Sequence, residues 1–191
     1  MVRVIAGSAK GRRLSTIRTL ALRPTADRVR EALFNILGVR IDGAVILDLF
    51  AGSGAVGLEA LSRGARLAMF VEVHTPACRL IEKNLRLCGL HEQATVWCHD
   101  VLNVLPTLKQ MSGQTFDVIF LDPPYRAALV ESVLQQLGDG QLLRTDGVVI
   151  AEHFFKRDLA ERYGRLHRVR IARFGDVALS FYQVNNREGG V

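Results

Sequence analysis

Asp122-Pro123-Pro124-Tyr125 is the stretch of this sequence that most clearly predicts chemistry. Two prolines fix φ and remove two backbone donors, so the turn is expected to be stiff and rich in acceptors. The Asp122 carboxylate and the Pro123 carbonyl suit an exocyclic amino group, which offers two N–H donors. Tyr125 offers a flat face on which a nucleobase can stack, a contact worth about 1–3 kcal/mol. The turn therefore predicts a site that orients the amino group of a base.

An amino group conjugated to a purine or pyrimidine is a poor nucleophile. Two acceptors that pull its hydrogens out of the ring plane release lone-pair density toward a nearby electrophile. Orientation and charge placement then carry most of the catalysis. The five histidines show no metal-ligand spacing, so we predict neither a metal ion nor histidine catalysis.

A glycine-rich segment, Gly52-Ser53-Gly54-Ala55-Val56-Gly57, fits the pattern G-x-G-x-x-G between a predicted strand and a predicted helix. Glycines here let the backbone approach a ligand without Cβ atoms in the way. Glu72 follows Gly52 by 20 residues, at the end of the next predicted strand, where an acid can bind ribose hydroxyls. By itself this pattern is also typical of a dinucleotide-binding dehydrogenase.

Asp48 distinguishes these two possibilities. It lies near the end of the strand that precedes the glycines, four positions before Gly52. A pyrophosphate would meet its negative charge at low dielectric, an unfavourable pairing by several kcal/mol. A cation is attracted instead, as are the sulfonium and ammonium groups of S-adenosylmethionine. Asp48 therefore favours a methyl donor over a dinucleotide.

Four acidic residues lie at the ends of four successive predicted strands: Asp48, Glu72, Asp100 and Asp122. Ligands of open α/β sheets bind outside the carboxyl ends of the strands, so all four are candidate site residues. Asp100 can accept a hydrogen bond from the adenine amino group, or it can cap the following helix.

Short apolar runs alternate with helical patterns from residue 44 onward. The expected strands are 44–50, 67–72, 94–98, 116–121 and 147–151, and the expected helices are 58–63, 76–87 and 129–137. This alternation indicates β-α-β crossovers in an open, doubly wound α/β sheet. Near the C-terminus the pattern changes, because residues 166–172 and 177–184 alternate with period two and predict an antiparallel hairpin.

The N-terminal 40 residues are expected to form an extension of the main domain. Residues 2–6 and 12–15 predict two short strands, and Thr25 is the expected N-cap of a helix with one apolar stripe. We therefore divide the chain into a basic extension at 1–40, a catalytic domain at 41–185 and a polar tail at 186–191.

The net charge of +6 is distributed unevenly. Residues 1–30 carry eight basic side chains and one acidic side chain, which gives +7, whereas residues 31–155 carry −5 and residues 156–173 carry +5. Basic side chains bind phosphate, and arginine also stacks on bases, so the extension is predicted to bind nucleic acid. Its candidate contacts are Arg3, Lys10, Arg12, Arg13, Arg23, Thr25, Arg28 and Arg30.

Taken together, these motifs resemble one family. Asp48-Leu-Phe-Ala-Gly-Ser-Gly54 with Asp122-Pro-Pro-Tyr125 is similar to class I S-adenosylmethionine-dependent methyltransferases that act on amino groups. The segments that narrow this resemblance are Gly7, Gly11-Arg-Arg-Leu14, Arg23-Pro-Thr25, Asp27 to Asn35 and Leu58 to Ala65. They resemble bacterial 16S ribosomal RNA guanine-N2 methyltransferases, which modify guanine 966. The resemblance covers nearly the whole chain.

The resemblance implies a Rossmann-like seven-stranded sheet, an RNA-binding N-terminal extension and a partly assembled 30S subunit as the substrate. It implies that Glu72 binds the donor ribose, Asp100 binds adenine and Asp122 to Tyr125 hold the target guanine. The residues implied to line the donor are Asp48, Phe50, Ala51, Gly52, Ser53 and Gly54. This chain departs from the family pattern at Val73-His74, where an acidic or polar residue is expected directly after Glu72.

The sequence also predicts the protein's setting. No stretch approaches 18 uninterrupted apolar residues and the N-terminus lacks an apolar signal region, so we expect a cytoplasmic bacterial protein without a membrane partner. Three cysteines spaced ten residues apart suit reduced thiols. We expect a monomer.

Three alternatives stay open. A DNA amino-methyltransferase or a protein glutamine methyltransferase can share the Asp122–Tyr125 turn. The basic extension favours nucleic acid over protein, and only the family resemblance separates RNA from DNA. A non-catalytic RNA-binding assembly factor is the third alternative, although Gly52, Gly54 and Glu72 are all intact.

Overall fold

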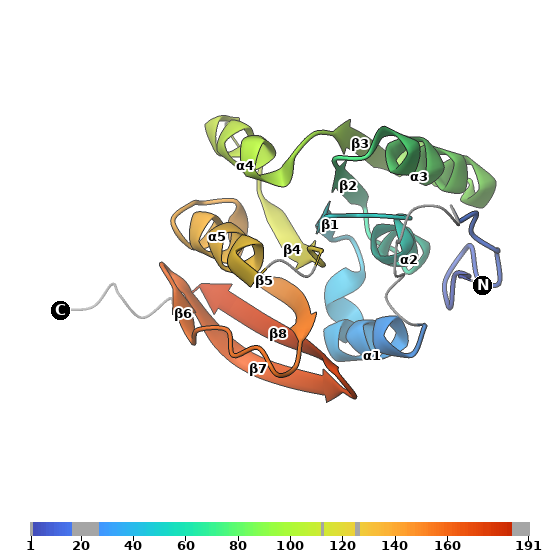
Figure 1. Cartoon of the computed structure of the whole chain (residues 1–191). Helices are drawn as coiled ribbons and strands as arrows, with labels where there is room; N and C mark the ends of the chain where they lie inside the picture. Colours follow the sequence, from blue (N-terminus) through green and yellow to red (C-terminus); the bar gives the residue numbers. More distant parts are fainter. Residues whose placement is uncertain (1, 17–26, 112, 125–126, 185–191) are drawn as a thin grey trace. The chain divides into compact units, whose positions relative to one another are not determined.

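The computed structural model describes residues 2–16, 27–111, 113–124 and 127–184 (Figure 1). The chain divides into two compact units, Met1–Val101 and Leu102–Val191. The predicted functional division at residue 40 stays a prediction. Four predicted features lie outside the described residues: Arg23, Thr25, Tyr125 and the tail at 186–191.

The first unit is built on three parallel strands in the order β3-β2-β1. They are β1 (Val45–Leu49), β2 (Leu67–Glu72) and β3 (Ala94–Cys98). β1 is buried along its whole length, as expected for an unbroken apolar run. The register pairs Asp48 with Phe70 and Glu72 with Cys98. The two acids therefore lie toward the carboxyl ends of neighbouring strands, as the sequence predicted.

Three helices belong to the first unit: α1 (Asp27–Leu37), α2 (Ala55–Ser62) and α3 (Thr75–Cys88). Short 3₁₀ turns follow α1 at Gly38–Ile41 and precede β3 at His91–Gln93. α3 is amphipathic and stops at Gly89, whose φ of 70° places it in the left-handed region that ends helices. Gly89 therefore ends α3.

α2 is buried on all sides, since each of its eight residues is buried. Gly57 is the reason that α2 lies so close to β2, because a Cβ atom at this position would lie 2.3 Å from the Phe70 ring. The third glycine of the G-x-G-x-x-G pattern thus serves helix-to-strand packing.

The second unit joins parallel and antiparallel strands, in the order β4-β5-β8-β7-β6. Its elements are α4 (Val101–Gln110, whose first residue closes the first unit), β4 (Phe116–Leu121), α5 (Ala127–Gly138), β5 (Leu143–Phe154), β6 (Arg162–Tyr163), β7 (Leu166–Phe174) and β8 (Val177–Val184). β4 pairs with β5 in parallel, whereas β5 with β8 and β7 with β8 are antiparallel. The predicted C-terminal hairpin is confirmed.

The described residues form eight strands where seven were expected. The additional strand is β6, two residues that pair with the start of β7. Tyr163 of β6 is buried, and its ring meets the Tyr182 ring edge to face at a centroid distance of 5.8 Å. Aromatic packing therefore holds a strand that is too short to give a periodic signal in the sequence.

Candidate functional site

The loop Phe50–Gly54, which we call the donor loop, connects β1 to α2 through three left-handed residues. Phe50, Gly52 and Gly54 have φ values of 60°, 55° and 76°. The loop is closed by hydrogen bonds from the Ala51 N–H to the Val71 carbonyl (3.0 Å) and from the Gly54 N–H to the Ala51 carbonyl (2.7 Å). Glycine adopts this backbone conformation freely, whereas at Phe50 it costs about 1–3 kcal/mol. The sequence predicted the glycine loop but not the strained Phe50.

Asp48 is a buried carboxyl group beneath this loop. Its side chain accepts a hydrogen bond from the Gly57 N–H at 2.9 Å, and the residue is only 2% exposed. Burial raises the pKa of Asp48 to about 7, the Gly57 hydrogen bond opposes that rise, and the negative charge of Glu72 adds to it. Such a group is half-charged near neutral pH and gains from a cationic partner.

Glu72 ends β2 and holds the donor loop from the side. Its Oε2 accepts the Gly52 N–H at 3.0 Å, and its Oε1 accepts the His74 N–H at 2.9 Å and lies 2.8 Å from His74 Nδ1. Glu72 is thus fixed against the first glycine of the pattern. His74, which stood out in the sequence as a departure from the family, is a direct partner of this carboxylate.

The other two predicted acids also follow their strands. Asp100 is exposed and comes directly before α4, at the place of an N-cap. Asp122 is the first residue after β4 and is half-buried, followed by buried Pro123 and exposed Pro124. Asp48, Glu72, Asp100 and the donor loop belong to the first unit, and Asp122 belongs to the second.

The residues at 2–14 form the basic hairpin. Arg3 and Arg13 form an antiparallel bridge, flanked by bonds from the Val4 N–H to the Arg12 carbonyl and from the Leu14 N–H to the Val2 carbonyl, both 2.9 Å. Val2, Val4 and Leu14 are buried. The predicted contacts that are exposed here and on α1 are Arg3, Lys10, Arg12, Arg13 and Arg28.

Glu59 and Ser62 of α2 attach this hairpin to the unit. The fully buried Glu59 carboxylate accepts the Ile5 N–H at 2.7 Å and the Ala6 N–H at 2.9 Å. The Ser62 hydroxyl accepts the Ala9 N–H at 2.9 Å and donates to the Ala6 carbonyl at 2.6 Å. These bonds satisfy backbone groups that would otherwise be buried without partners.

Arg30 departs from its prediction as a phosphate contact. Its side chain is 0% exposed and donates through Nη2 to the Arg3 carbonyl and, at 3.0 Å, to Asp27. Its Nε lies 3.7 Å from the Glu59 carboxylate. A guanidinium enclosed in this way has no surface for a phosphate, so Arg30 joins α1 to the hairpin and to α2.

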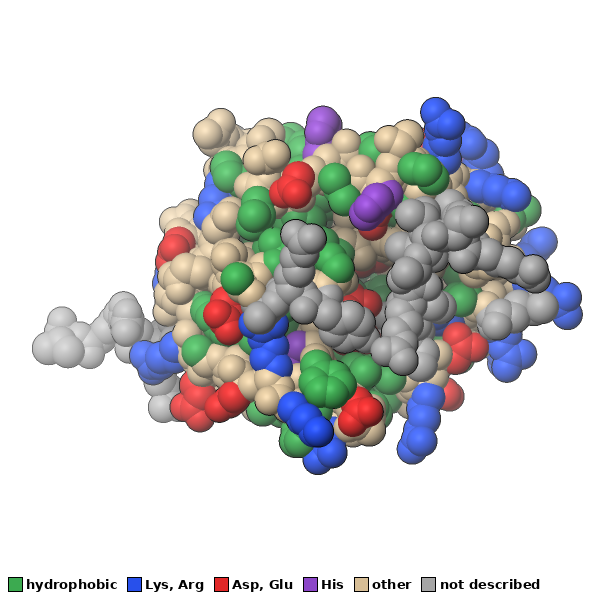
Figure 2. All heavy atoms as spheres, in the orientation of Figure 1, with side chains coloured by type: hydrophobic (Ala, Val, Ile, Leu, Met, Phe, Trp, Pro, Cys, Tyr) green, Lys and Arg blue, Asp and Glu red, His purple; other side chains and the backbone are tan. Residues whose placement is uncertain are grey.

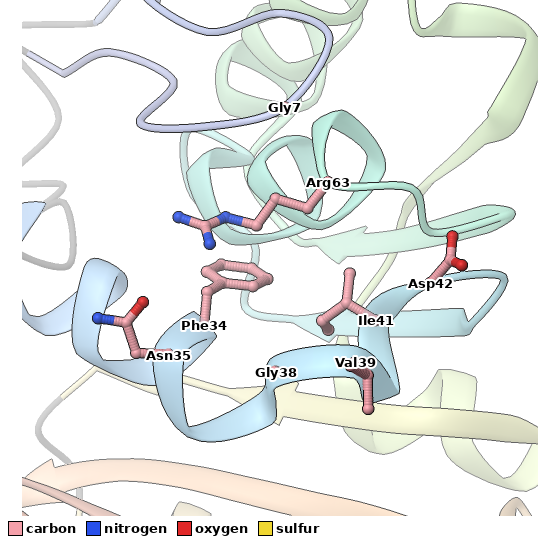
Figure 3. A pocket seen from close by; sticks show the side chains of 8 residues that line it. All are labelled: Gly7, Phe34, Asn35, Gly38, Val39, Ile41, Asp42 and Arg63. Atoms are coloured by element: carbon pink, nitrogen blue, oxygen red, sulfur yellow. The ribbon is translucent and has the colours of Figure 1, made fainter.

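An open cavity of about 670 Å³ lies beside this attachment (Figure 3). Figure 3 shows the Arg63 guanidinium reaching over the Phe34 ring, with Asn35 and Val39 at the rim. Arg63 Cζ lies 4.9 Å from the ring centroid, and Nε donates to Glu59 at 2.7 Å. The cavity is thus lined by α1, by the 3₁₀ turn that follows it and by Arg63, the residue directly after α2, and its lining does not include the donor loop.

Sequence reasoning missed Glu59, Ser62 and Asn84. Each is a polar residue at a buried helical position, and Asn84 lies on the same stripe as Ile81 and Leu85. A polar residue inside an apolar stripe was the available signal, because burial requires it to find hydrogen-bond partners.

Neither a metal cluster nor a membrane span is found in the described part of the chain. No group of three or more His, Cys, Asp or Glu residues there could hold a metal ion. No described helix has the length and apolar character needed to cross a bilayer.

The family described as Conserved hypothetical protein 95 matches residues 2–183. The chain belongs to this family. Two relatives of this chain are named Ribosomal RNA small subunit methyltransferase D. The protein of Escherichia coli K12 is 37% identical, over 95% of this chain and 89% of its own. The protein of Haemophilus influenzae is 41% identical, over 79% of this chain and 78% of its own. The resemblance drawn from the sequence motifs is confirmed.

Solved structures confirm the Rossmann-like α/β fold. A hypothetical protein of Thermus thermophilus is 34% identical and superimposes with a TM-score of 0.83, covering 96% of this chain and all of the other. An RNA methyltransferase of Salinibacter ruber, solved with S-adenosyl-L-homocysteine, has a TM-score of 0.65 over 85% of this chain and 94% of its own. Because the second is only 16% identical, it speaks for the fold alone.

Proposed function

We propose that this protein transfers a methyl group from S-adenosylmethionine to the exocyclic N2 amine of a guanine in 16S ribosomal RNA, within a partly assembled small subunit. The observation that carries the proposal is the buried Asp48 carboxyl beneath a glycine loop that Glu72 holds in place. The family relationship to small-subunit ribosomal RNA methyltransferases supports the choice of RNA.

The residues around the donor loop fit a cationic donor. Burial has raised the pKa of Asp48 to about 7, so a nearby positive charge is stabilised as the carboxyl gives up its proton. A pyrophosphate at the same place would meet Asp48 and Glu72 together. Asp48 and Phe50–Gly54 would line the donor, Glu72 would take its ribose and Asp100 its adenine. The donor supplies an electrophilic methyl group on a positively charged sulfur.

Asp122 and the Pro123 carbonyl would hold the target amine through its two N–H groups. With both hydrogens fixed, the nitrogen lone pair would be directed out of the ring plane and would be available to an electrophilic methyl carbon. Tyr125 would stack on the guanine, which must leave its own base stack to reach the turn. Asp122 is half-buried and comes directly after β4.

The basic hairpin would bind the RNA backbone through Arg3, Lys10, Arg12 and Arg13, with Arg28 of α1 and the predicted contacts Arg23 and Thr25. The first four are exposed on a hairpin whose backbone is fixed to α2, so their charges are displayed from a rigid base. In this proposal residues 1–40 select the RNA, residues 41–185 carry out the transfer, and the protein acts as a monomer in the bacterial cytoplasm.

Asp122→Ala tests the assignment of the reaction. We expect the variant to lose methyl transfer to immature 30S particles by at least about 100-fold, as for other positioned catalytic groups, while its affinity for S-adenosylhomocysteine changes little. Transfer is measured with a tritiated methyl group, and the modified nucleotide is mapped. Lost donor affinity with intact turnover would contradict the role of Asp122. A methylated adenine, or activity on DNA alone, would overturn the proposed substrate.

A further inference from the structure

Asn84 of α3 connects the donor loop to the basic hairpin. Its side chain is completely buried. The amide Nδ2 donates to the Ser53 carbonyl in the donor loop at 3.1 Å and to the Ser15 carbonyl, directly after the hairpin, at 3.2 Å. Its Oδ1 accepts the Ser15 N–H at 2.8 Å. One side chain therefore uses both of its polar atoms on the two segments.

These contacts constrain each other because all three depend on one amide group, whose side chain is completely buried. If Ser15 moved away, Asn84 would lose the donor to Oδ1 and one of the acceptors for Nδ2. An unpaired buried polar group costs about 1–3 kcal/mol, so the amide would turn toward new partners and its bond to Ser53 would weaken. The position of the hairpin and the shape of the donor loop are thus linked through a single rotatable group.

We propose that Asn84 is a positioning residue that couples RNA binding at the hairpin to donor binding at the loop, so that each ligand raises the affinity for the other. The inference rests on the proposed function, which supplies the two ligands. Asn84 bonds to Ser15 and to Ser53 in the same conformation of its side chain. A ligand that fixes one of the two segments therefore favours the conformation in which the other segment binds its own ligand. The coupling must be equal in both directions.

The test measures both affinities with and without the second ligand. S-adenosylhomocysteine, which cannot transfer a methyl group, is titrated by equilibrium dialysis in the presence and absence of saturating immature 30S particles. The affinity for these particles is measured by filter binding with and without S-adenosylhomocysteine. In the wild-type protein we expect each ligand to lower the Kd of the other by about fivefold or more, by the same factor in both experiments.

Ser15→Pro removes the N–H that Asn84 accepts and leaves Ser53 untouched. We expect the coupling factor to fall toward one, while the two separate affinities change less than the coupling does. Ser15→Ala is the matched control, since it keeps both backbone groups and should keep the full factor. Asn84→Asp retains the acceptor for Ser15 but loses both Nδ2 donations, and should also weaken the coupling.

A thermal unfolding curve shows whether Ser15→Pro is folded. If this variant does not fold, the coupling factor of Asn84→Asp tests the inference instead. Full coupling in either variant would overturn the inference, as would a factor of one in a wild-type protein that methylates 16S ribosomal RNA. A wild-type protein that neither binds nor methylates immature 30S particles would overturn the proposed function itself, which is a different result.

Discussion

Asp48 and Glu72 show how a few side chains prepare a site for positive charge. Asp48 carries a raised pKa because it is buried, and Glu72 lies near enough for its charge to raise that pKa further. At and below about pH 7 the free protein therefore often holds a proton on Asp48 that a cationic donor would displace. The affinity for such a donor should depend on pH in the neutral range, where few carboxylates titrate.

The affinity for S-adenosylmethionine should rise with pH between about 6 and about 7.5, by at most about tenfold per pH unit, since one carboxyl group is involved. Asp48→Asn should bind more weakly at the upper end and lose this dependence. Calorimetry at a series of pH values measures both effects. A wild-type affinity that does not change with pH would contradict the raised pKa of Asp48.

The same carboxyl group affects folding with the opposite trend. Its pKa in the folded protein, about 7, lies above its ordinary value, so the folded state binds more protons between these values. The contribution of Asp48 to the stability of the folded protein is therefore complete below the ordinary pKa of the group and is lost as the pH rises through about 7. Denaturation by urea at several pH values should show this decline in the wild-type protein and not in Asp48→Asn.

At the residue scale, the sequence could identify groups whose role follows from their spacing. Asp48 and Glu72 stand at fixed distances from the glycines, and the structure places both against the loop or its helix. Arg30 could not be assigned correctly, because its charge says nothing about the direction of its side chain. It lies on the same helical stripe as Val29 and Leu33, both of which are buried, and the buried Glu59 draws it inward.

At the element scale, the basic hairpin depends on the close approach of its turn to α2. Gly7 has a φ of 82°, and a Cβ atom there would lie 1.7 Å from the Ser62 carbonyl oxygen. Gly11 has a similar φ of 81°, but a Cβ atom there would meet nothing within 4 Å. An alanine at Gly11 would therefore cause backbone strain alone, whereas an alanine at Gly7 would also disturb the contact with α2.

Gly7→Ala should displace the hairpin, whereas Gly11→Ala should only strain it. We expect Gly11→Ala to cost about 1–2 kcal/mol of stability from its left-handed backbone, and Gly7→Ala to cost clearly more. The affinity for 16S ribosomal RNA should fall in Gly7→Ala and be nearly normal in Gly11→Ala. Urea denaturation and filter binding measure the two effects, and equal RNA affinities in the two variants would argue against the hairpin as the RNA contact.

The sequence patterns predicted neither α4 nor the full length of β5, because the local sequence of each element conflicts with the structure that it forms. α4 contains Pro106, which removes a backbone donor, yet the helix forms because Val101, Val104, Leu105 and Leu108 make a buried stripe. β5 extends four residues before its predicted start, through polar positions at 144–146. Tertiary pairing with β4 decides its length, and no local pattern records that pairing.

On the scale of the molecule, positive charge in the first unit extends beyond the hairpin. Arg79, Lys83 and Arg86 occupy the exposed side of α3. Arg12 of the hairpin lies near the end of this helix, because its positive charge opposes the rise that burial causes in the pKa of Cys88. Figure 2 shows Lys and Arg side chains gathered on the side that carries α3 and the hairpin. The charge count along the chain included α3 in the interval 31–155, which is acidic in sum. Such a count does not show which side chains share one surface of the folded protein.

Replacing Arg12 and Arg13 by alanine should weaken RNA binding and flatten its salt dependence. Each lost phosphate contact lowers the slope of log K against log salt by about 0.7–0.9, so the double variant should lose about 1.5. Filter binding at several salt concentrations measures the slope. Arg66→Ala, an exposed arginine of the same unit outside the hairpin and α3, is the control and should leave the slope unchanged. An unchanged slope in the double variant would remove this pair from the interface.

The attachment of the hairpin through main-chain groups has a consequence for evolution. Ile5, Ala6, Ser8, Ala9 and Ser15 are all held by their own N–H groups, and α2 and α3 supply the partners Glu59, Ser62 and Asn84. Side chains on the outer face can therefore mutate without loosening the anchorage. Such a segment is exchangeable: grafting it between relatives that retain these three anchors should transfer substrate preference while the catalytic framework stays the same.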